Sequence, residues 1–191
     1  MIIDVHSHTP QFRHAVPPEH RRLHHTWRPD RSVDSVYSWN DFLEAQKPAD
    51  KSIVFGVAWA PGERTGGVNG FNEPGDVAVG VNDATSAFAL AHPDRLIGFM
   101  SVHPHDPKAL EEIERSRTDL GLKGIKMGAN YQVFEPLESR ALAIYREAER
   151  HGLPILFHIG TSPVRTAPIK YAHPLVVDEI AMRYPNLKII M

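Results

Sequence analysis

Residues 121–160 contain GLKGIKM (121–127), PLESRALAIYREAERHG (136–152) and LPILFHIG (153–160), in that order. The first and last stretches are short apolar runs typical of strands buried on both faces. The middle stretch has apolar residues at helical spacing, and Gly152 is a residue typical of a helix C-terminus. A strand, a helix and a second strand in this order predict a parallel βαβ unit with a right-handed crossover.

The same alternation extends along the chain in both directions and predicts an α/β protein. A parallel sheet of this kind is either an open doubly wound sheet or a (β/α)8 barrel. Two long loops are expected, near 9–36 and 60–81, because both stretches are rich in proline or glycine. Helices are predicted at 38–47, 82–93, 106–119, 136–152 and 173–185, and six strands near 2–6, 52–59, 95–102, 122–127, 154–159 and 187–191.

Composition limits the class of protein. The 191 residues are 42% hydrophobic and 23% charged, with a net charge of −2, which fits one globular domain over 1–191. The balanced charge gives no sign of a nucleic-acid partner. There is no apolar run long enough to span a membrane and no signal peptide. The chain has no cysteine, so a cytoplasmic localisation is expected and any metal must be bound by His, Asp or Glu.

Three histidines lie at predicted strand ends. His6 and His8 follow an apolar run that we interpret as a short buried strand, Ile2, Ile3 and Val5, and alternation along it places both imidazoles on one side. His158 ends the fifth strand, which in a barrel lies across the axis from the first. Three imidazoles with a position left for water are typical of a catalytic metal site. The alternative is that these are ordinary polar residues of loops and strand ends.

Other side chains are weaker candidates for a substrate site. Lys126, at the end of the fourth strand, could lie near an anionic substrate, and His103, which follows the third strand, could line the pocket. Arg165 could pair with a substrate carboxylate, although an exposed arginine is the ordinary interpretation. Tyr131 and Phe134 either shape the wall of the pocket or pack in the core.

Five stretches resemble the amidohydrolase superfamily, in the branch that includes aminocarboxymuconate-semialdehyde decarboxylase and the amidohydrolase 2 proteins. The resemblance implies a TIM-type (β/α)8 barrel, of which about six strands are present in this chain. It implies one divalent metal, Zn2+ with Mn2+ as the alternative, bound by His6, His8 and His158. The stretches are DVHSH (4–8), HPDRLIGFMSVHPHDP (92–107), LKGIKMGANYQVFEP (122–136), GLPILFHIGTSP (152–163) and HPLVVDEIAMRYPNLKIIM (173–191).

The resemblance also implies groups that this chain does not contain. A fourth ligand, an aspartate, follows the eighth strand of such enzymes, and an acid/base histidine follows the sixth. Both are expected beyond Met191, so we expect a truncation of a longer protein, with a complete chain as the alternative. An incomplete barrel exposes apolar edges, which favours association into a homo-oligomer.

The function expected from these features is that of a metal-dependent hydrolase. Metal-activated water would attack an amide, lactone or related bond of a small acidic substrate. The first alternative is a metal-dependent, non-oxidative decarboxylase of an aromatic or dienoic acid. The second is a non-catalytic fragment or binding module.

Overall fold

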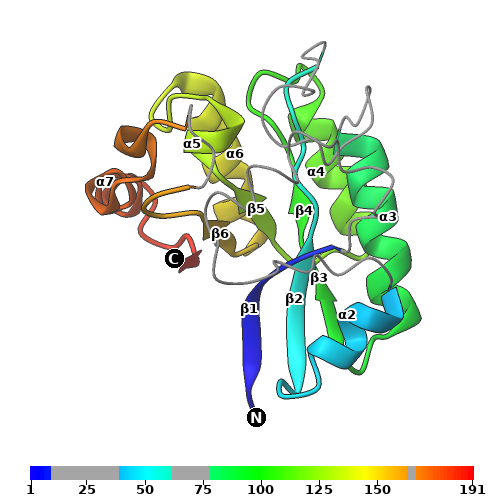
Figure 1. Ribbon diagram of the computed structural model, residues 1–191. Helices are drawn as coiled ribbons and strands as arrows, with labels where there is room; N and C mark the ends of the chain where they lie inside the picture. The colour runs from blue at the N-terminus through cyan, green and yellow to red at the C-terminus, as the bar shows by residue number, and fades with distance from the viewer. Residues whose placement is uncertain (10–38, 62–77, 163–166) are drawn as a thin grey trace, which may run out of the picture.

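The computed structural model describes residues 1–9, 39–61, 78–162 and 167–191. Within these residues, parallel strands alternate with helices, as the sequence predicts (Figure 1). The strands are β1 (Ile3–His8), β2 (Lys51–Phe55), β3 (Leu96–Gly98), β4 (Met100–Ser101), β5 (Ile125–Met127), β6 (Ile155–Phe157) and β7 (Ile189–Ile190). The helices are α2 (Trp39–Ala45), α3 (Ala78–Ala91), α4 (Ala109–Thr118), α5 (Ala129–Gln132), α6 (Ser139–His151) and α7 (Pro174–Arg183), with a 3-10 helix, η2 (Ile169–Ala172).

The order of the strands in space decides between the two architectures. β3 and β4 are two halves of one predicted strand, divided at Phe99. The Phe99 N–H donates to the Val54 carbonyl at 2.9 Å, and the Met100 N–H donates to the Gly124 carbonyl at 2.8 Å. This strand therefore continues a sheet in which β1 to β7 are neighbours in chain order. A doubly wound sheet reverses its order and a barrel does not, so the described strands form part of a barrel.

Side chains of the strands alternate between the inside of the barrel and the helices. Phe55 and Leu156 belong to an inner cluster drawn from β2, β6 and Phe99. Val54 points the other way and packs on Phe42 and Phe88 of α2 and α3. The larger outer core lies between β4, β5 and β6 and the helices α4, α6 and α7. Figure 1 shows α3 and α4 beside β2 to β4, and α6 and α7 beyond β5 and β6.

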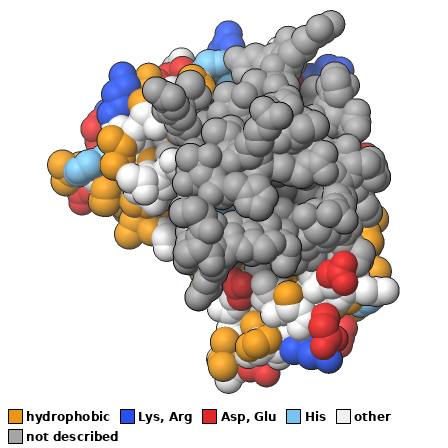
Figure 2. Space-filling model, in the orientation of Figure 1, with side chains coloured by type: hydrophobic (Ala, Val, Ile, Leu, Met, Phe, Trp, Pro, Cys, Tyr) orange, Lys and Arg blue, Asp and Glu red, His pale blue; other side chains and the backbone are white. Residues whose placement is uncertain are grey.

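The first strand differs from its prediction. Ile2, Ile3 and Val5 were expected to be buried, but they are 64%, 43% and 38% exposed. Among the described residues β1 pairs only with β2, so one of its edges has no strand beside it. Figure 2 shows hydrophobic side chains at the lower end of the molecule, where Figure 1 places the N-terminus. The helix α3 also differs from its prediction, because it begins at Ala78 inside the loop expected near 60–81.

Tertiary contact explains the early start of α3. Gly80 lowers helix propensity and favours a loop in the sequence. Val81 packs so closely on Gly56, just after β2, that its Cγ1 would lie 2.4 Å from a Cβ at that position. This contact holds the first turn of the helix against the sheet. None of the helices in the described ranges is both long and apolar enough to cross a membrane.

Candidate active site

A bulge in β1 sets the directions of the first two histidines. The pairing of β1 with β2 shifts by one residue between Asp4 and Ser7. The Asp4 carboxylate accepts the His6 backbone N–H at 3.0 Å and the Ser7 hydroxyl at 2.8 Å. Burial alone would raise the pKa of Asp4, but these hydrogen bonds lower it overall, so the carboxylate remains charged. Ser7 is buried while His6 and His8 are exposed on the other face of the strand.

The structure brings the three predicted metal ligands together. The ring centroids of His6 and His8 are 5.5 Å apart, and those of His6 and His158 are 6.2 Å apart. Imidazoles that share one ion have centroids about 3.2 Å from it, because the metal–nitrogen bond is roughly 2.1 Å long. Two such rings are therefore about 5–6.4 Å apart, depending on their angle at the ion. The two centroid distances lie in this range, but the ring nitrogens of the three histidines do not all lie within 4.8 Å of one another, so the rings would have to turn to share one ion.

A hydrogen bond determines which ring nitrogen of His158 carries the proton. Its Nε2 lies 3.2 Å from the Thr161 carbonyl, so Nε2 carries the proton and donates it. The Nδ1 lone pair is then the one suited to binding a metal, and a backbone carbonyl is a common partner for the other nitrogen of a metal ligand. The backbone N–H of His158 donates to the Met127 carbonyl at 2.9 Å, which ties this end of β6 to β5.

All three imidazoles favour the neutral form, which is the form that binds metals. Burial by surrounding protein atoms, and then the charge of Lys126, lower the pKa of His6 to about 4 and that of His8 to about 3. The same two causes lower the pKa of His158, against its hydrogen bond to Thr161. His6 and His8 are nevertheless partly exposed to solvent.

Lys126 lies inside the barrel beside these histidines. Its neighbours on β5, Ile125 and Met127, face the outer core, so alternation turns Lys126 inward. The side chain is 1% exposed, and its Nζ lies 4.9 Å from the centre of the Phe55 ring. No hydrogen-bond partner for Nζ is found among the described residues. Burial lowers the pKa of Lys126 to about 7.

His103 is held by hydrogen bonds to the backbone. Its Nε2 lies 2.7 Å from the Gln132 carbonyl, and its Nδ1 accepts the His105 backbone N–H at 3.1 Å. Both ring nitrogens are thus engaged by the backbone, and the contact of His103 with a substrate stays a prediction. Arg165 lies outside the described residues.

Gln132 connects three segments at the carboxyl ends of the strands. Its side-chain amide donates to the Ala58 carbonyl at 2.7 Å and to the Val102 carbonyl at 3.2 Å, and its Oε1 accepts the Gly128 N–H at 2.7 Å. Trp59 and Tyr131, the neighbours of the bonded residues, pack on each other in a small buried cluster. The Tyr131 ring also lies 5.2 Å from that of His158, so this cluster adjoins the histidines.

The sequence analysis did not identify Trp59, and it allowed Tyr131 either in the wall of the pocket or in the core. Burial raises the pKa of Tyr131, so its phenol keeps the proton and can donate it. The signal for Trp59 was its position, four residues past the carboxyl end of β2, in a fold whose sites form at strand ends.

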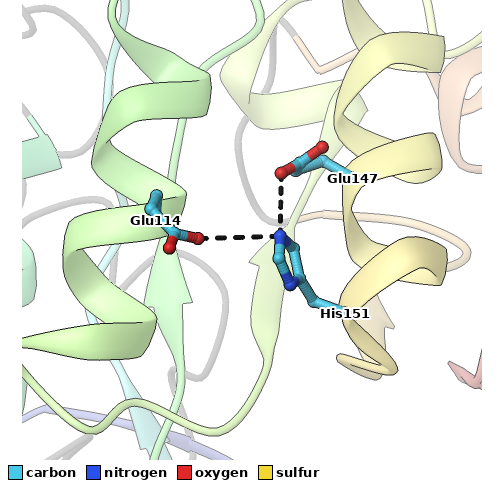
Figure 3. Close-up of side chains that lie close together, drawn as sticks. All are labelled: Glu114, Glu147 and His151. Carbon is cyan, nitrogen blue, oxygen red and sulfur yellow. Dashed lines mark hydrogen bonds and ion pairs between the residues drawn. The ribbon is translucent and has the colours of Figure 1, made fainter.

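A second group of metal-ligand residues lies away from the barrel end. Figure 3 shows the His151 ring between two carboxylates, 2.9 Å from Glu147 of α6 and 3.6 Å from Glu114 of α4. Within the described part of the chain, it is the one group of three such residues whose ligand atoms all lie within 4.8 Å. Arg117 and Arg150 already pair with the two carboxylates. We therefore interpret the group as an ion-pair network that joins α4 to α6.

Solved structures with the same fold are relatives of low sequence identity. The 5-carboxyvanillate decarboxylase of Novosphingobium aromaticivorans, complexed with manganese and 4-hydroxy-3-methoxy-5-nitrobenzoic acid, is 19% identical over 99% of this chain (TM-score 0.65). The 2,6-dihydroxybenzoate decarboxylase of Rhizobium is 17% identical over 98% (TM-score 0.60). The 4-oxalomesaconate hydratase of Rhodopseudomonas palustris is 17% identical over 99% (TM-score 0.61). This chain spans 64%, 64% and 61% of their lengths.

Sequence comparison gives the family. No curated protein sequence matches this chain significantly. A model of the amidohydrolase family matches residues 3–191, nearly the whole sequence. The resemblance found in the motifs is confirmed, and so is the TIM-type barrel fold that it implied. The described strands are parallel and form part of the barrel of this fold. The chain therefore belongs to the amidohydrolase 2 family.

Proposed function

We propose that this protein is a metal-dependent decarboxylase that releases CO2 from a small aromatic acid without an oxidant. The observation that carries the proposal is the position of Lys126, a buried amine beside His6, His8 and His158. Its amine has no hydrogen-bond partner in the described residues, and in its protonated form it suits the anionic oxygens of a carboxylate or phenolate. Two relatives named above are decarboxylases of aromatic acids, which favours this reaction over the hydrolysis expected from the sequence.

The reaction divides naturally between the residues of the site. His6, His8 and His158 would hold a divalent ion, for which manganese has a precedent in the relative and zinc is the metal implied by the family resemblance. When bound, the ion supplies positive charge that orients the substrate oxygens. Lys126 would pair with an anionic oxygen and fix the acid in the barrel. The bond from the ring carbon to the carboxylate breaks and its electrons remain on that carbon. CO2 leaves, and a proton from solvent water takes the vacated position.

The test is a substrate panel with two matched lysine variants. The purified protein, supplied with Mn2+ or Zn2+, is incubated with hydroxylated benzoates and separately with lactones and amides. Release of CO2 from the benzoates is expected, and Lys126→Met should abolish it. Lys123→Met is the control, because Lys123 is an exposed lysine three residues earlier. Opening of lactones or amides without CO2 release would replace the proposal with hydrolysis, and full activity in Lys126→Met would remove Lys126 from the site.

A further inference from the structure

A buried polar network runs from two outer helices to the backbone of Lys126 inside the barrel. Its central members are Asn82 of α3, Ser101 of β4 and Glu112 of α4, which are 0%, 1% and 4% exposed. Polar side chains buried to this extent normally have their hydrogen bonds made, and all three do here. Figure 1 shows both helices beside β4. The network therefore links two helices to one end of this strand.

The side chain of Asn82 takes the place of a neighbouring strand along β4. On one edge β4 pairs with β5. On the other edge the Asn82 Oδ1 accepts the Ser101 N–H at 2.8 Å, and its Nδ2 donates to the Ser101 carbonyl at 3.2 Å. Nδ2 also donates to the Glu112 carboxylate at 2.8 Å, and Arg115 donates to the same carboxylate at 2.8 Å. The amide is thus held from the helices, and it holds the backbone of β4 in turn.

Ser101 transmits this constraint to Lys126 and to the loop after β2. Met100 and Val102 face the outer core, so alternation turns Ser101 into the barrel, as it does Lys126. The two residues are partners in register on adjacent strands, which lie about 4.8 Å apart. The Ser101 hydroxyl donates to the Lys126 carbonyl at 3.3 Å and accepts the Ala58 N–H at 3.0 Å. Ser101 therefore joins the backbone that carries the Lys126 side chain to the loop at Ala58.

The amine of Lys126 depends on its backbone for direction. Its Nζ has no hydrogen-bond partner among the described residues, and it lies 4.9 Å from the centre of the Phe55 ring. A lysine side chain is a flexible stem, so the place of the amine follows from where the stem begins and from the walls around it. A displacement of about 1 Å in a group that binds substrate can cost about a hundredfold in rate. A residue that fixes the Lys126 backbone can therefore control the site.

We infer that Ser101 is a positioning residue for Lys126, held in place by Asn82 and Glu112, and that it keeps the lysine amine directed at an anionic oxygen of the substrate. In this role the serine acts through the backbone of β5 and not through contact with the substrate. The inference rests on the proposed function, in which Lys126 binds that oxygen. It adds to that function a part for α3 and α4, two helices on the outside of the barrel.

The experiment is a double-mutant cycle in ligand binding. The affinity of the Mn2+-supplied protein for 4-hydroxybenzoate is measured by titration calorimetry. Ser101→Ala should weaken binding about tenfold, the effect of about one lost hydrogen bond at the lysine. Lys126→Met should weaken it by at least as much. In the Lys126→Met background Ser101→Ala should have no further effect, because the group that it positions is then absent.

Two further variants separate positioning from a loss of stability. Ser86→Ala is the matched control, because Ser86 is also buried, at 3% exposed, and its hydroxyl donates to the Leu120 carbonyl at 2.7 Å, between α3 and the loop after α4. It should lower the urea midpoint and leave the affinity unchanged. Ser101→Cys keeps the size of the side chain and replaces the hydroxyl with a weakly bonding thiol. It should weaken binding even where Ser101→Ala does not fold.

Each other outcome has a distinct meaning. Equal loss of affinity from Ser101→Ala with and without Lys126 would overturn the inference, because the serine would then act on the structure as a whole. Wild-type affinity in both serine variants would also overturn it, while CO2 release would leave the decarboxylase proposal intact. The expected coupling in a protein that releases no CO2 would retain the inference and reject the reaction. Unchanged affinity in Lys126→Met would overturn both, because the lysine would then lie outside the binding site.

Discussion

Replacing Gly128 with alanine tests how closely the Tyr131 ring packs on the backbone at this position. An ideal Cβ at this position would lie 1.9 Å from Cζ, 2.4 Å from Cε1 and 2.3 Å from Oη of Tyr131. Ordinary contacts begin at 3.4 Å, so the ring must move by 3.4 minus 1.9, or about 1.5 Å. Gly128 has a φ of −139°, so alanine meets no left-handed strain there and the effect is steric.

The expected cost follows from this clash. Overpacking of this kind costs about 1–3 kcal/mol. For a chain of this size, 2 kcal/mol lowers the melting temperature by about 4–8 °C, which circular dichroism can measure. Gly80→Ala is the control, because no atom lies within 4 Å of its Cβ and alanine favours the helix.

A double-mutant cycle decides whether Tyr131 is the cause. In a Tyr131→Ala background the clash disappears, so Gly128→Ala should cost less than about 0.5 kcal/mol there. The coupling energy between the two positions should then be about 1–3 kcal/mol. An equal cost in both backgrounds would refute the reasoning, because it would show that the alanine disturbs something other than the tyrosine ring.

Three further predictions concern charge and metal binding. Lys126→Met should raise the free energy of unfolding at pH 7 by about 2–4 kcal/mol in urea titrations. The pKa of Lys126 falls from 10.5 to about 7 on folding, so wild-type stability should rise between these pH values and the rise should vanish in the variant. His158→Ala should weaken Mn2+ binding by about a hundredfold in equilibrium dialysis, whereas His92→Ala should retain it. Glu147→Gln should lower the free energy of unfolding by about 0.5 kcal/mol at neutral pH, measured in urea titrations. The hydrogen bond from Arg150 is the main cause that lowers the pKa of Glu147, so the difference in stability between wild type and variant should shrink as the pH falls through the acid range.

The sequence predicted the elements whose signals are local. The helix before Gly152 was expected to end there, and Gly152 has the left-handed φ of 66° that suits glycine at a helix end. The strand that ends at His158 was equally clear from its apolar run. His6, His8 and His158 could be proposed together because parallel strands bring their carboxyl ends to one side of a sheet. Their role as metal ligands stays a prediction.

The exposure of β1 and the surroundings of Lys126, Trp59 and Tyr131 depend on packing between distant segments. The exposure of Ile2 and Ile3 depends on which strands lie beside β1, and the bulge depends on its pairing with β2. The sequence suggested Lys126 only as a lysine near an anionic substrate, whereas its burial beside three imidazoles depends on alternation along β5 and on packing inside the partial barrel. Trp59 and Tyr131 are 72 residues apart, counting from 59 to 131, and meet because Gln132 bonds to Ala58. Local periodicity carries no information about such contacts, because burial and hydrogen bonding across the barrel exist only once the chain has folded.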